Sequence, residues 1–574
     1  MNGMNGFVRV AAGTFDIATG AVEKNAQKAA LLINQAGRLG VNILVLPELC
    51  TTGSCCGALF HNSVLLDAAE RAEAALVKAT EGSQTLVAFG TMREINGTPA
   101  SAIAVAQNGA MIVCIPTDGV NVLNSTGGVS VGFVFYEQLT AGAIPAADVV
   151  CVLSSAPATA DSFDDVNAAL AHSARLKDCV ILLASTAGDS VTDDVYDGQY
   201  AIVSPKETLV SGCTLFEARL AVCDVDIAAQ QAKYVAAQPA FSLKELESTT
   251  AAVSRAPWNH DRRRCLRALE LQAQALARRL RHTGNKGFVL GVSGGLDSSL
   301  ALLCCVRAAE LLSLDRKAVL GISMPGFGTS LTTKNNAKLL MDALGVSQET
   351  VPIGDSVLMH FKDIGHDPNV RNVAYENAQS RERTQVLLDI ANDRQLLCVG
   401  TGDLSEEFLG FCTFGGDSLF MYGVNASITK TFMRQIIDAA CETFTDAEKA
   451  LRDILETPVS PELLPADGEK ITQRTEEIVG PYDLQDFYIY NFVKYGMTPE
   501  QLFQRARIAF GGDYDDAVLK DRLKELFRRF FANQFKRNSA PEGACVTDVT
   551  VSSRSFAMAG DMSGEEWLRR IDAL

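Results

Sequence analysis

Several features that would assign the chain to a familiar class are missing from its 574 residues. None of the 15 cysteines forms a Cys-x-x-Cys pair, and no zinc site is visible. Basic residues are outnumbered, with 51 Lys and Arg against 68 Asp and Glu, and the net charge of −17 argues against a general nucleic-acid-binding protein. No apolar run is long enough to span a bilayer, and the N-terminus lacks the charged and apolar segments of a signal peptide. We therefore expect no nucleic-acid or membrane partner, and a cytoplasmic location in which the cysteines are reduced core thiols.

The composition and the order of apolar segments predict two α/β domains. Hydrophobic residues make up 47% and charged residues 21% of the chain, as in globular proteins, and its length exceeds what one core can use. Strand-like segments dominate residues 1–228, which predicts a layered α/β domain, and residues 229–260 lack periodicity and are predicted to be a linker. Over residues 261–545 strand and helix patterns alternate, which predicts a doubly wound parallel sheet, and residues 546–574 are a C-terminal tail.

Apolar periodicity gives the individual elements. In the first domain the predicted helices are 21–39, 65–80 and 163–176, and the predicted strands are 6–12, 41–46, 85–92, 102–107, 111–116, 129–135, 148–153, 179–184, 200–203 and 220–225. In the second domain the predicted helices are 261–281, 300–312, 333–344 and 372–392, and the predicted strands are 287–290, 318–323, 350–353 and 396–401.

The most informative stretch is Gly-Val-Ser-Gly-Gly-Leu-Asp-Ser-Ser at residues 291–299. It lies between a predicted strand and a predicted helix, so it is a glycine-rich turn that leads into a helix N-terminus. Gly294 and Gly295 allow a ligand to approach the backbone closely, and the first amides of the helix favour a pyrophosphate. The turn is therefore predicted to bind phosphate.

The polar side chains of this turn argue against a role in packing alone, for which apolar residues would be expected. Ser293, Ser298 and Ser299 offer hydroxyl groups, whereas Asp297 is an anion where a phosphate would be repelled. A carboxylate beside a triphosphate has a function if it binds Mg²⁺. The lysine of a P-loop is missing, which excludes a kinase or GTPase loop. The pattern Ser-Gly-Gly-x-Asp-Ser resembles the loop of the ATP pyrophosphatases, which split ATP into AMP and pyrophosphate.

Further polar clusters are predicted at the same edge of the sheet. They are Met-Pro-Gly-Phe-Gly-Thr (324–329), Gly-Thr-Gly-Asp-Leu-Ser-Glu (400–406), the segment 414–430 with Asp417 and Lys430, and the helical segment 377–383 with Asn377, Arg381 and Arg383. Arginines suit phosphates, and carboxylates suit a metal ion or an ammonium ion. Ordinary surface polarity would not place all of these groups near the phosphate turn.

Together these motifs resemble NAD synthetase. The resemblance also includes Met-Tyr-Gly-Val-Asn-Ala-Ser-Ile (421–428), Thr-Pro-Val-Ser-Pro-Glu-Leu (457–463), Gly-Pro-Tyr-Asp-Leu (480–484) and Arg-Arg-Phe-Phe-Ala-Asn-Gln-Phe-Lys-Arg (528–537), and it covers about residues 260–545. It implies a fold of the ATP pyrophosphatase type. It also implies that ATP and Mg²⁺ convert the nicotinate carboxylate of deamido-NAD to an adenylate, from which ammonia displaces AMP.

The resemblance implies a role for each matching residue. Pyrophosphate would be bound by Ser293, Gly294, Gly295, Asp297 and Ser298. The Mg²⁺ ligands would be Asp297 and Glu406, and the rest of the nucleotide site would include Met324, Arg381, Thr401 and Lys536. Asp417 and Lys430 would be catalytic residues at the nicotinate end. Ser418 and Phe420 depart from the family, which usually has histidine and serine there, and these departures bear on substrate affinity.

Residues 1–228 resemble the nitrilase-like glutaminase domain of long NAD synthetases, through Arg-Val-Ala-Ala (9–12) and Pro-Glu-Leu-Cys-Thr-Thr-Gly (47–53). Nitrilases use a glutamate base, a lysine that stabilises the oxyanion and a cysteine nucleophile. Glu48 matches the base, but Thr117 replaces the lysine and Tyr136 replaces the cysteine. A phenol with a pKa of about 10 does not substitute for a thiolate in amide cleavage. We therefore expect an inactive glutaminase domain, although Cys50, Cys55 and Cys56 remain an alternative source of a nucleophile.

Three functional hypotheses follow. The first is an ATP-dependent ligase that amidates deamido-NAD with free ammonia. The second is the same ligase supplied by glutamine, through an unrecognised nucleophile or a partner glutaminase. The third is a non-catalytic nucleotide-binding partner of a working synthetase. The carboxylates suited to a metal speak against it, because a non-catalytic subunit has no use for them. The resemblance further implies a homo-oligomer with paired synthetase domains and an assembly as large as an octamer.

Overall fold

The computed structural model describes residues 7–116, 121–124, 128–189, 192–227, 253–255, 261–329, 331–457, 476 and 479–574. The chain divides into two compact units, Met1–Leu246 and Glu247–Leu574. Except for residues 253–255, the predicted linker lies outside the described residues, as do Thr117 and residues 458–463 of one motif. None of the described helices is long and apolar enough to cross a membrane.

Unit 1 contains two six-stranded mixed sheets, in the orders β12-β1-β2-β3-β4-β5 and β11-β10-β9-β8-β7-β6. The first sheet consists of β1 (Phe7–Thr14), β2 (Ile43–Val45), β3 (Leu86–Ile95), β4 (Thr98–Gln107), β5 (Ala110–Pro116) and β12 (Arg219–Asp226). The second consists of β6 (Asn121–Asn124), β7 (Ser130–Phe135), β8 (Val149–Ser154), β9 (Val180–Ser185), β10 (Tyr200–Val203) and β11 (Thr208–Gly212). The helical elements are α1 (Val22–Arg38), η1 (Gly57–His61), α2 (Ser63–Ala79), α3 (Tyr136–Thr140) and α4 (Ser162–Lys177).

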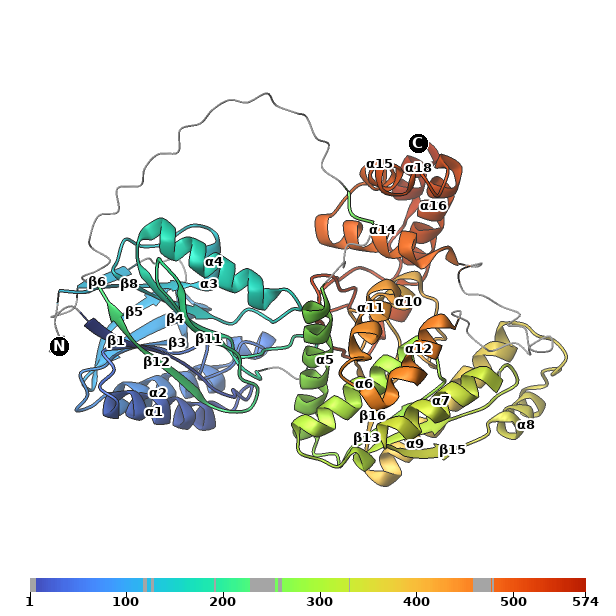
Figure 1. Ribbon diagram of the computed structural model, residues 1–574, viewed down its shortest axis with the longest axis horizontal. Coiled ribbons are helices and arrows are strands. Elements are labelled where there is room, and N and C mark those ends of the chain that lie inside the picture. The colour runs from blue at the N-terminus through green and yellow to red at the C-terminus, as the bar shows by residue number, and fades with distance from the viewer. Residues whose placement is uncertain are drawn as a thin grey trace. The chain divides into compact units, whose positions relative to one another are not determined.

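The two sheets of unit 1 pack face to face, with helices on their outer faces (Figure 1). Alternate side chains of a strand point to opposite faces of its sheet. Val10 of β1 therefore shares the inner core with Phe133 of β7, whereas Ala11 packs outward with Leu32 of α1. On the other side Leu170 of α4 packs against the second sheet. The predicted layered α/β domain is confirmed as an α-β-β-α sandwich.

Sequence periodicity missed the two edge strands of the second sheet, β6 and β11. Both are short, and β11 has only exposed or half-buried residues, so neither carries a clear apolar alternation. The ten strands predicted for residues 1–228 all correspond to observed strands within a few residues.

Unit 2 is built on a five-stranded parallel sheet in the order β15-β14-β13-β16-β17. Its strands are β13 (Phe288–Gly291), β14 (Val319–Ser323), β15 (Ser347–Thr350), β16 (Leu397–Gly400) and β17 (Tyr422–Gly423). The predicted doubly wound sheet is therefore confirmed. The strand predicted at 350–353 is wrong in position: β15 ends at Thr350, and the chain then enters a helix that the sequence did not reveal.

Helices cover both faces of this sheet. α8 and α9 share a core cluster with Val289 of β13 and Ile322 of β14. Outside that cluster, α6 contacts both strands and α7 contacts β14. The helical elements up to the last strand are α5 (Arg262–Thr283), α6 (Leu296–Leu311), η2 (Arg316–Ala318), α7 (Leu331–Leu344), α8 (Gly354–Ile364), α9 (Val373–Arg394) and α10 (Leu404–Leu409). Those that follow are α11 (Lys430–Ala440), η3 (Thr445–Ala447), α12 (Glu448–Glu456), α14 (Tyr482–Tyr495), α15 (Pro499–Phe510), α16 (Asp516–Ala532), α17 (Gln534–Asn538) and α18 (Glu565–Asp572).

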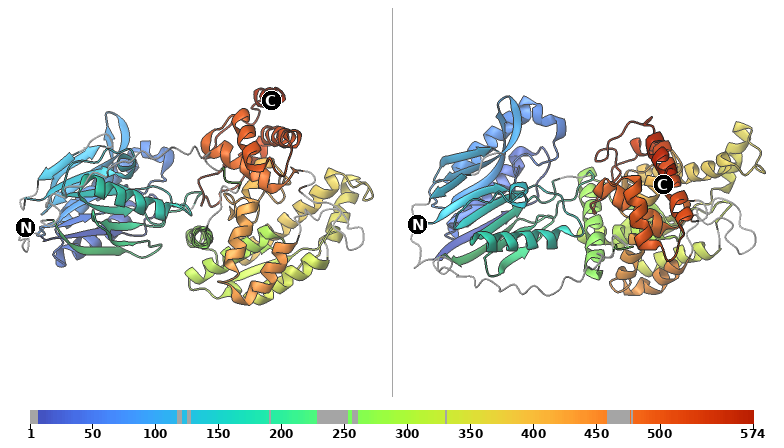
Figure 2. Two further views of the ribbon diagram at one scale, coloured as in Figure 1. Left: turned by 45° about the horizontal axis from the view of Figure 1, so that its top comes forward. Right: turned by 90° about the horizontal axis from the view of Figure 1, so that it is seen from above.

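The C-terminal helices form a subassembly at one side of unit 2, coloured orange to red (Figures 1 and 2). The predicted tail belongs to it, because Trp567 of α18 packs on Phe531 of α16 with ring centroids 4.8 Å apart. The subassembly contacts α10 through Arg537 of α17. This buried guanidinium donates to the carbonyl of Phe408 at 2.9 Å and so holds the C-terminal end of α10.

Candidate active site

A cavity of about 340 Å³ opens at the carboxyl edge of the parallel sheet. From β13 the chain proceeds outward to β14 and β15 and then returns to β16 on the other side, so the strand order reverses at β13. Ligands of doubly wound proteins bind in the crevice at such a reversal. The residues that line the cavity include Ser293, Gly295, Asp297, Ser298, Met324, Ser380, Arg383, Thr401, Asp403, Glu406, Asp417, Ser418, Phe420 and Lys536.

The turn after β13 has the backbone conformation of a phosphate loop. Gly294 has φ of +89°, and a Cβ atom on it would lie 2.2 Å from the carbonyl oxygen of Thr333, so only glycine fits. The hydroxyls of Ser293 and Ser298 lie 3.2 Å apart, and that of Ser293 accepts from the amide of Gly295 at 3.2 Å. Gly295 is the N-cap of α6 and offers no side-chain acceptor to the first amides of that helix. The predicted pyrophosphate-binding residues therefore meet in one loop that faces the cavity.

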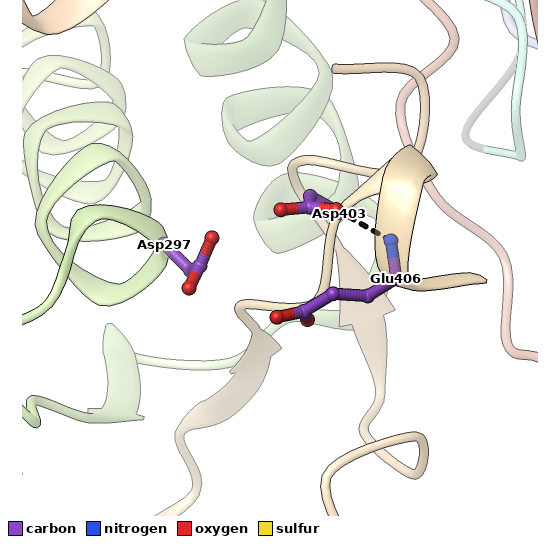
Figure 3. A group of neighbouring side chains, drawn as sticks. All are labelled: Asp297, Asp403 and Glu406. Carbon is purple, nitrogen blue, oxygen red and sulfur yellow. Dashed lines mark hydrogen bonds between the residues drawn. The ribbon is translucent and has the colours of Figure 1, made fainter. Parts of the chain in front are cut away.

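Three carboxylates converge beside this loop. Asp297 comes from the first turn of α6, and Asp403 and Glu406 come from the start of α10, with carboxylate oxygens within 4.8 Å of one another (Figure 3). Asp403 is also the N-cap of α10, where its Oδ1 accepts from the amide of Glu406 at 2.8 Å. The ammonium of Lys430 contacts all three: it pairs with Asp297, with Asp403 at 2.7 Å and with Glu406 at 2.9 Å.

Burial dominates the electrostatics of this cluster. It raises the pKa of Asp403 well above its ordinary value and that of Glu406 to about 7, although Lys430 opposes both shifts. Burial disfavours the charge of Lys430 as well, but the attraction of the three carboxylates outweighs it and raises the pKa of Lys430. Three carboxylates and one ammonium carry a net charge of −2 when all are ionised.

This charge and the all-oxygen donor set fit a divalent cation such as Mg²⁺. The sequence predicted Asp297 and Glu406 as ligands, and the structure brings them together. It adds Asp403, which the sequence placed in the same cluster without a metal role. The structure places Lys430 among these carboxylates, whereas the resemblance had placed it at the nicotinate end with Asp417.

Four other residues of unit 2 that the sequence predicted for the site also lie at the cavity. Met324, Thr401, Asp417 and Lys536 line it. Asp417 is buried and accepts from the amide of Thr413 at 2.6 Å and from the hydroxyl of Ser380 at 3.1 Å, and burial raises its pKa. The ammonium of Lys536 donates to the carbonyl oxygens of Gly410 and Cys412 at 2.7 and 2.8 Å.

The arginines of α9 divide between the cavity and the surface. The exposed Arg381 donates to the carbonyl of Phe414 at 3.2 Å and is absent from the cavity lining. Arg383, two residues later, lines the cavity and donates to the carbonyl of Met324 at 3.1 Å. The sequence analysis placed both arginines in one polar cluster and assigned Arg381 to the nucleotide site. Helical spacing alone does not reveal which side of α9 faces the crevice.

Phe420 shapes one wall of the cavity. A Cβ atom on Gly400 would lie 2.1 Å from its ring, and a Cβ atom on Gly423 would lie 2.8 Å from it. The ring therefore occupies space left by glycines at the ends of β16 and β17. Phe420 and Ser418, the two departures from the family pattern, both line the cavity.

Unit 1 contains the predicted residual base, Glu48, in a buried position after β2. Burial raises the pKa of Glu48 to about 7, with a smaller contribution from the charge of Glu137. Its carboxylate accepts from the hydroxyl of Ser155 at 2.9 Å. Tyr136 begins α3 and packs against the hydrophobic cluster beneath α4, and burial raises the pKa of its phenol.

Two of the three cysteines that follow Glu48, Cys50 and Cys56, are poor thiolates. Burial raises the pKa of Cys50 to about 12 and that of Cys56 to about 11. Cys55 is half-buried, with its Sγ atom 3.4 Å from the hydroxyl of Tyr196. A cysteine ionises near neutral pH when a nearby cation or a helix N-terminus lowers the pKa of its thiol. Burial in apolar surroundings raises that pKa instead.

Comparisons with known proteins find a different family in each of the two units. Residues 268–538 match the family described as NAD synthase, and residues 9–120 match the family described as carbon-nitrogen hydrolase. The chain therefore carries a domain of the NAD synthase family and a nitrilase-like domain, as the sequence motifs predicted.

Curated relatives match this chain over almost its whole length. A glutamine-dependent NAD(+) synthetase from Mycobacterium tuberculosis is 28% identical over 99% of this chain and 98% of its own. A protein of the same name from Mycobacterium leprae is also 28% identical, over 99% and 98% of the two chains. The alignment with the first spans 675 positions, more than the 574 residues of this chain, so the relative carries segments that this chain lacks.

Solved structures support the fold. A glutamine-dependent NAD(+) synthetase from Cytophaga hutchinsonii superposes with a TM-score of 0.79 at 17% identity, over 99% of this chain and 100% of its own. The enzyme of the same name from Acinetobacter baumannii, in complex with ADP, superposes with a TM-score of 0.64 at 18% identity, over 97% and 99%.

Proposed function

We propose that this protein amidates deamido-NAD to NAD at the expense of ATP and uses free ammonia as the nitrogen donor. The observation that carries the proposal is a contrast between the two units. In unit 2 the phosphate loop and three carboxylates line one cavity, and the ammonium of Lys430 contacts all three carboxylates. In unit 1, Glu48 is the one match to the three nitrilase catalytic groups.

The reaction has two steps. A carboxylate oxygen of the nicotinate bonds to the α-phosphorus of ATP, and the bond from that phosphorus to pyrophosphate breaks. The nitrogen of ammonia then bonds to the acyl carbon, AMP leaves and nitrogen loses a proton. The Ser293 and Ser298 hydroxyls and the Gly295 amide are suited to hold the pyrophosphate group. The ADP complex of the Acinetobacter baumannii enzyme supports an adenine nucleotide as a ligand.

Charged residues of the cavity would serve these steps. Mg²⁺, when bound by Asp297, Asp403 and Glu406, would stabilise negative charge on the phosphates. Lys430 would add a fixed positive charge in the same place. Asp417 is a buried carboxylate with a raised pKa, so it is suited to bind an ammonium ion and to accept its proton.

A second candidate is glutamine-dependent synthesis, which the names of the relatives favour. It requires an ionised nucleophile in unit 1, and burial of Cys50 and Cys56 argues against one there. The two candidates are separated by measuring AMP, NAD and glutamate with deamido-NAD, ATP and either ammonium chloride or glutamine. We expect equimolar AMP and NAD with ammonium and background glutamate with glutamine. Stoichiometric glutamate and NAD from glutamine alone would support the second candidate and would point to Cys55 for mutation.

We also propose that the protein is a homo-oligomer with paired synthetase domains, as the family resemblance implies. Static light scattering at micromolar concentration is expected to give a mass of at least twice 61.4 kDa. A monomeric mass under these conditions would refute this part of the proposal.

A further inference from the structure

Asp486 is a buried carboxylate on α14 that the proposed chemistry does not use. Its exposed fraction is zero, and it is absent from the cavity lining. One carboxylate oxygen accepts from the hydroxyl of Ser405 at 2.6 Å. The other accepts from the amide of Thr431 at 2.9 Å and from its hydroxyl at 2.7 Å. Asp486 thus receives three hydrogen bonds from two segments that are distant in the chain.

Both segments carry charged groups of the cluster formed by the three carboxylates and Lys430. Ser405 lies on α10 between the N-cap Asp403 and Glu406. Thr431 follows Lys430, the first residue of α11. The hydroxyl of Ser405 also accepts from the amide of Lys430 at 3.1 Å, which closes the connection between the two helices. One carboxylate therefore joins the backbone that carries two metal ligands to the backbone that carries the cluster's ammonium.

The fourth charged group, Asp297, is attached in a different way. The side-chain amide of Asn425 donates to the carbonyl oxygens of Asp297 and Thr401 at 3.1 and 3.0 Å, which joins α6 to the loop after β16. Asp486 therefore links α10 to α11, whereas Asn425 links α6 to the loop after β16. All three groups donate hydrogen bonds to Asp486, and a carboxylate can accept them with both of its oxygens. The side-chain amide of asparagine at this position would place its NH₂ group against at least one of these donors.

Burial raises the pKa of Asp486 to about 6, with hydrogen bonds from Ser405 and Thr431 opposing the shift. Its carboxylate is therefore mostly ionised near neutral pH and acts as an acceptor toward both helices. Residues that orient metal ligands from behind typically change metal affinity by about 10- to 100-fold when they are replaced.

We propose that Asp486 is a positioning residue that fixes Lys430 relative to Asp403 and Glu406 and thereby sets the affinity of the cluster for a divalent cation. The proposal rests on the proposed function only in naming the metal site, because cation binding is measurable without substrates.

The test is the binding of Mn²⁺ alone to the full chain, measured by electron paramagnetic resonance. Asp486→Asn is expected to weaken Mn²⁺ binding by about 10- to 100-fold. Ser405→Ala, which keeps the carboxylate and removes one link, is expected to weaken it measurably, by a smaller factor than Asp486→Asn. This second variant keeps the test decisive if Asp486→Asn does not fold.

Tyr488→Phe is the matched control on the same helix. It removes a buried hydrogen bond, from the Tyr488 hydroxyl to the carbonyl of Leu519 at 3.0 Å, without touching α10 or α11. A structural effect alone would lower the unfolding temperature of this variant and leave Mn²⁺ affinity unchanged. Wild-type Mn²⁺ affinity in folded Asp486→Asn, or in Ser405→Ala if the first variant is unfolded, would overturn the proposal. If Mn²⁺ affinity falls as expected while the wild-type protein forms no NAD, the proposed substrate is wrong and the positioning role stands.

Discussion

Asp297→Ala is expected to lower pyrophosphate release from ATP by about 10³-fold or more, because the variant loses one ligand of the proposed metal site. The substitution also removes one of the three partners of Lys430. Asp297 has a side chain that is 26% exposed, so its loss should leave the fold intact. The measurement is the rate of pyrophosphate release at saturating ATP, deamido-NAD and ammonium, with circular dichroism to verify folding.

Asp342→Ala is the matched control for this prediction. Its carboxylate pairs with Lys338 at 2.9 Å on α7 and is 45% exposed, away from the residues that line the cavity. We expect wild-type turnover from this variant. Near-normal pyrophosphate release from Asp297→Ala would show that the loop after β13 does not bind the reacting phosphates.

Lys430→Met is expected to lower the free energy of unfolding by about 3–5 kcal/mol, the range measured when one partner of a buried ion pair is removed. The Lys430 side chain is 2% exposed and contacts Asp297, Asp403 and Glu406, which would be left without a cation. Denaturant unfolding measures the loss. Because a divalent cation that binds the folded state stabilises it, millimolar Mg²⁺ should restore part of the stability.

The same substitution at Lys494 provides the control. Lys494 pairs with Asp548 at 2.5 Å, but its side chain is 30% exposed, and partly exposed pairs contribute roughly 0–1 kcal/mol. A loss in Lys430→Met no larger than in Lys494→Met would contradict the central place of Lys430 in the carboxylate cluster.

The fold was largely predictable because its core strands have strong apolar patterns. The run at 287–290 is buried on both faces of a parallel sheet and shows as continuous apolar sequence. The elements that sequence analysis missed lack such a signal. β17 has two residues, β11 is a half-exposed edge strand, and β15 alternates half-buried and exposed polar residues.

The site was predictable where residues lie next to one another in the chain. The loop 291–299 contains its glycines, its serines and Asp297 in one stretch, so its chemistry could be inferred directly. The orientation of α9, which places Arg383 and not Arg381 in the cavity lining, depends on tertiary packing. The convergence of Lys430 on Asp403, and the hydrogen bonds of Asp486, join segments 27 to 81 residues apart and leave no local pattern.

The nitrogen source of NAD tests the central claim most directly. The protein is incubated with ATP, Mg²⁺, deamido-NAD, ordinary ammonium chloride and glutamine labelled with ¹⁵N in its amide, and the NAD that forms is analysed by mass spectrometry. Our account predicts NAD whose carboxamide carries ¹⁴N, because the phosphate loop and the three carboxylates of unit 2 line one cavity, whereas in unit 1 Tyr136 stands where the nitrilase motif has its cysteine. Incorporation of ¹⁵N, or the absence of NAD, would contradict it.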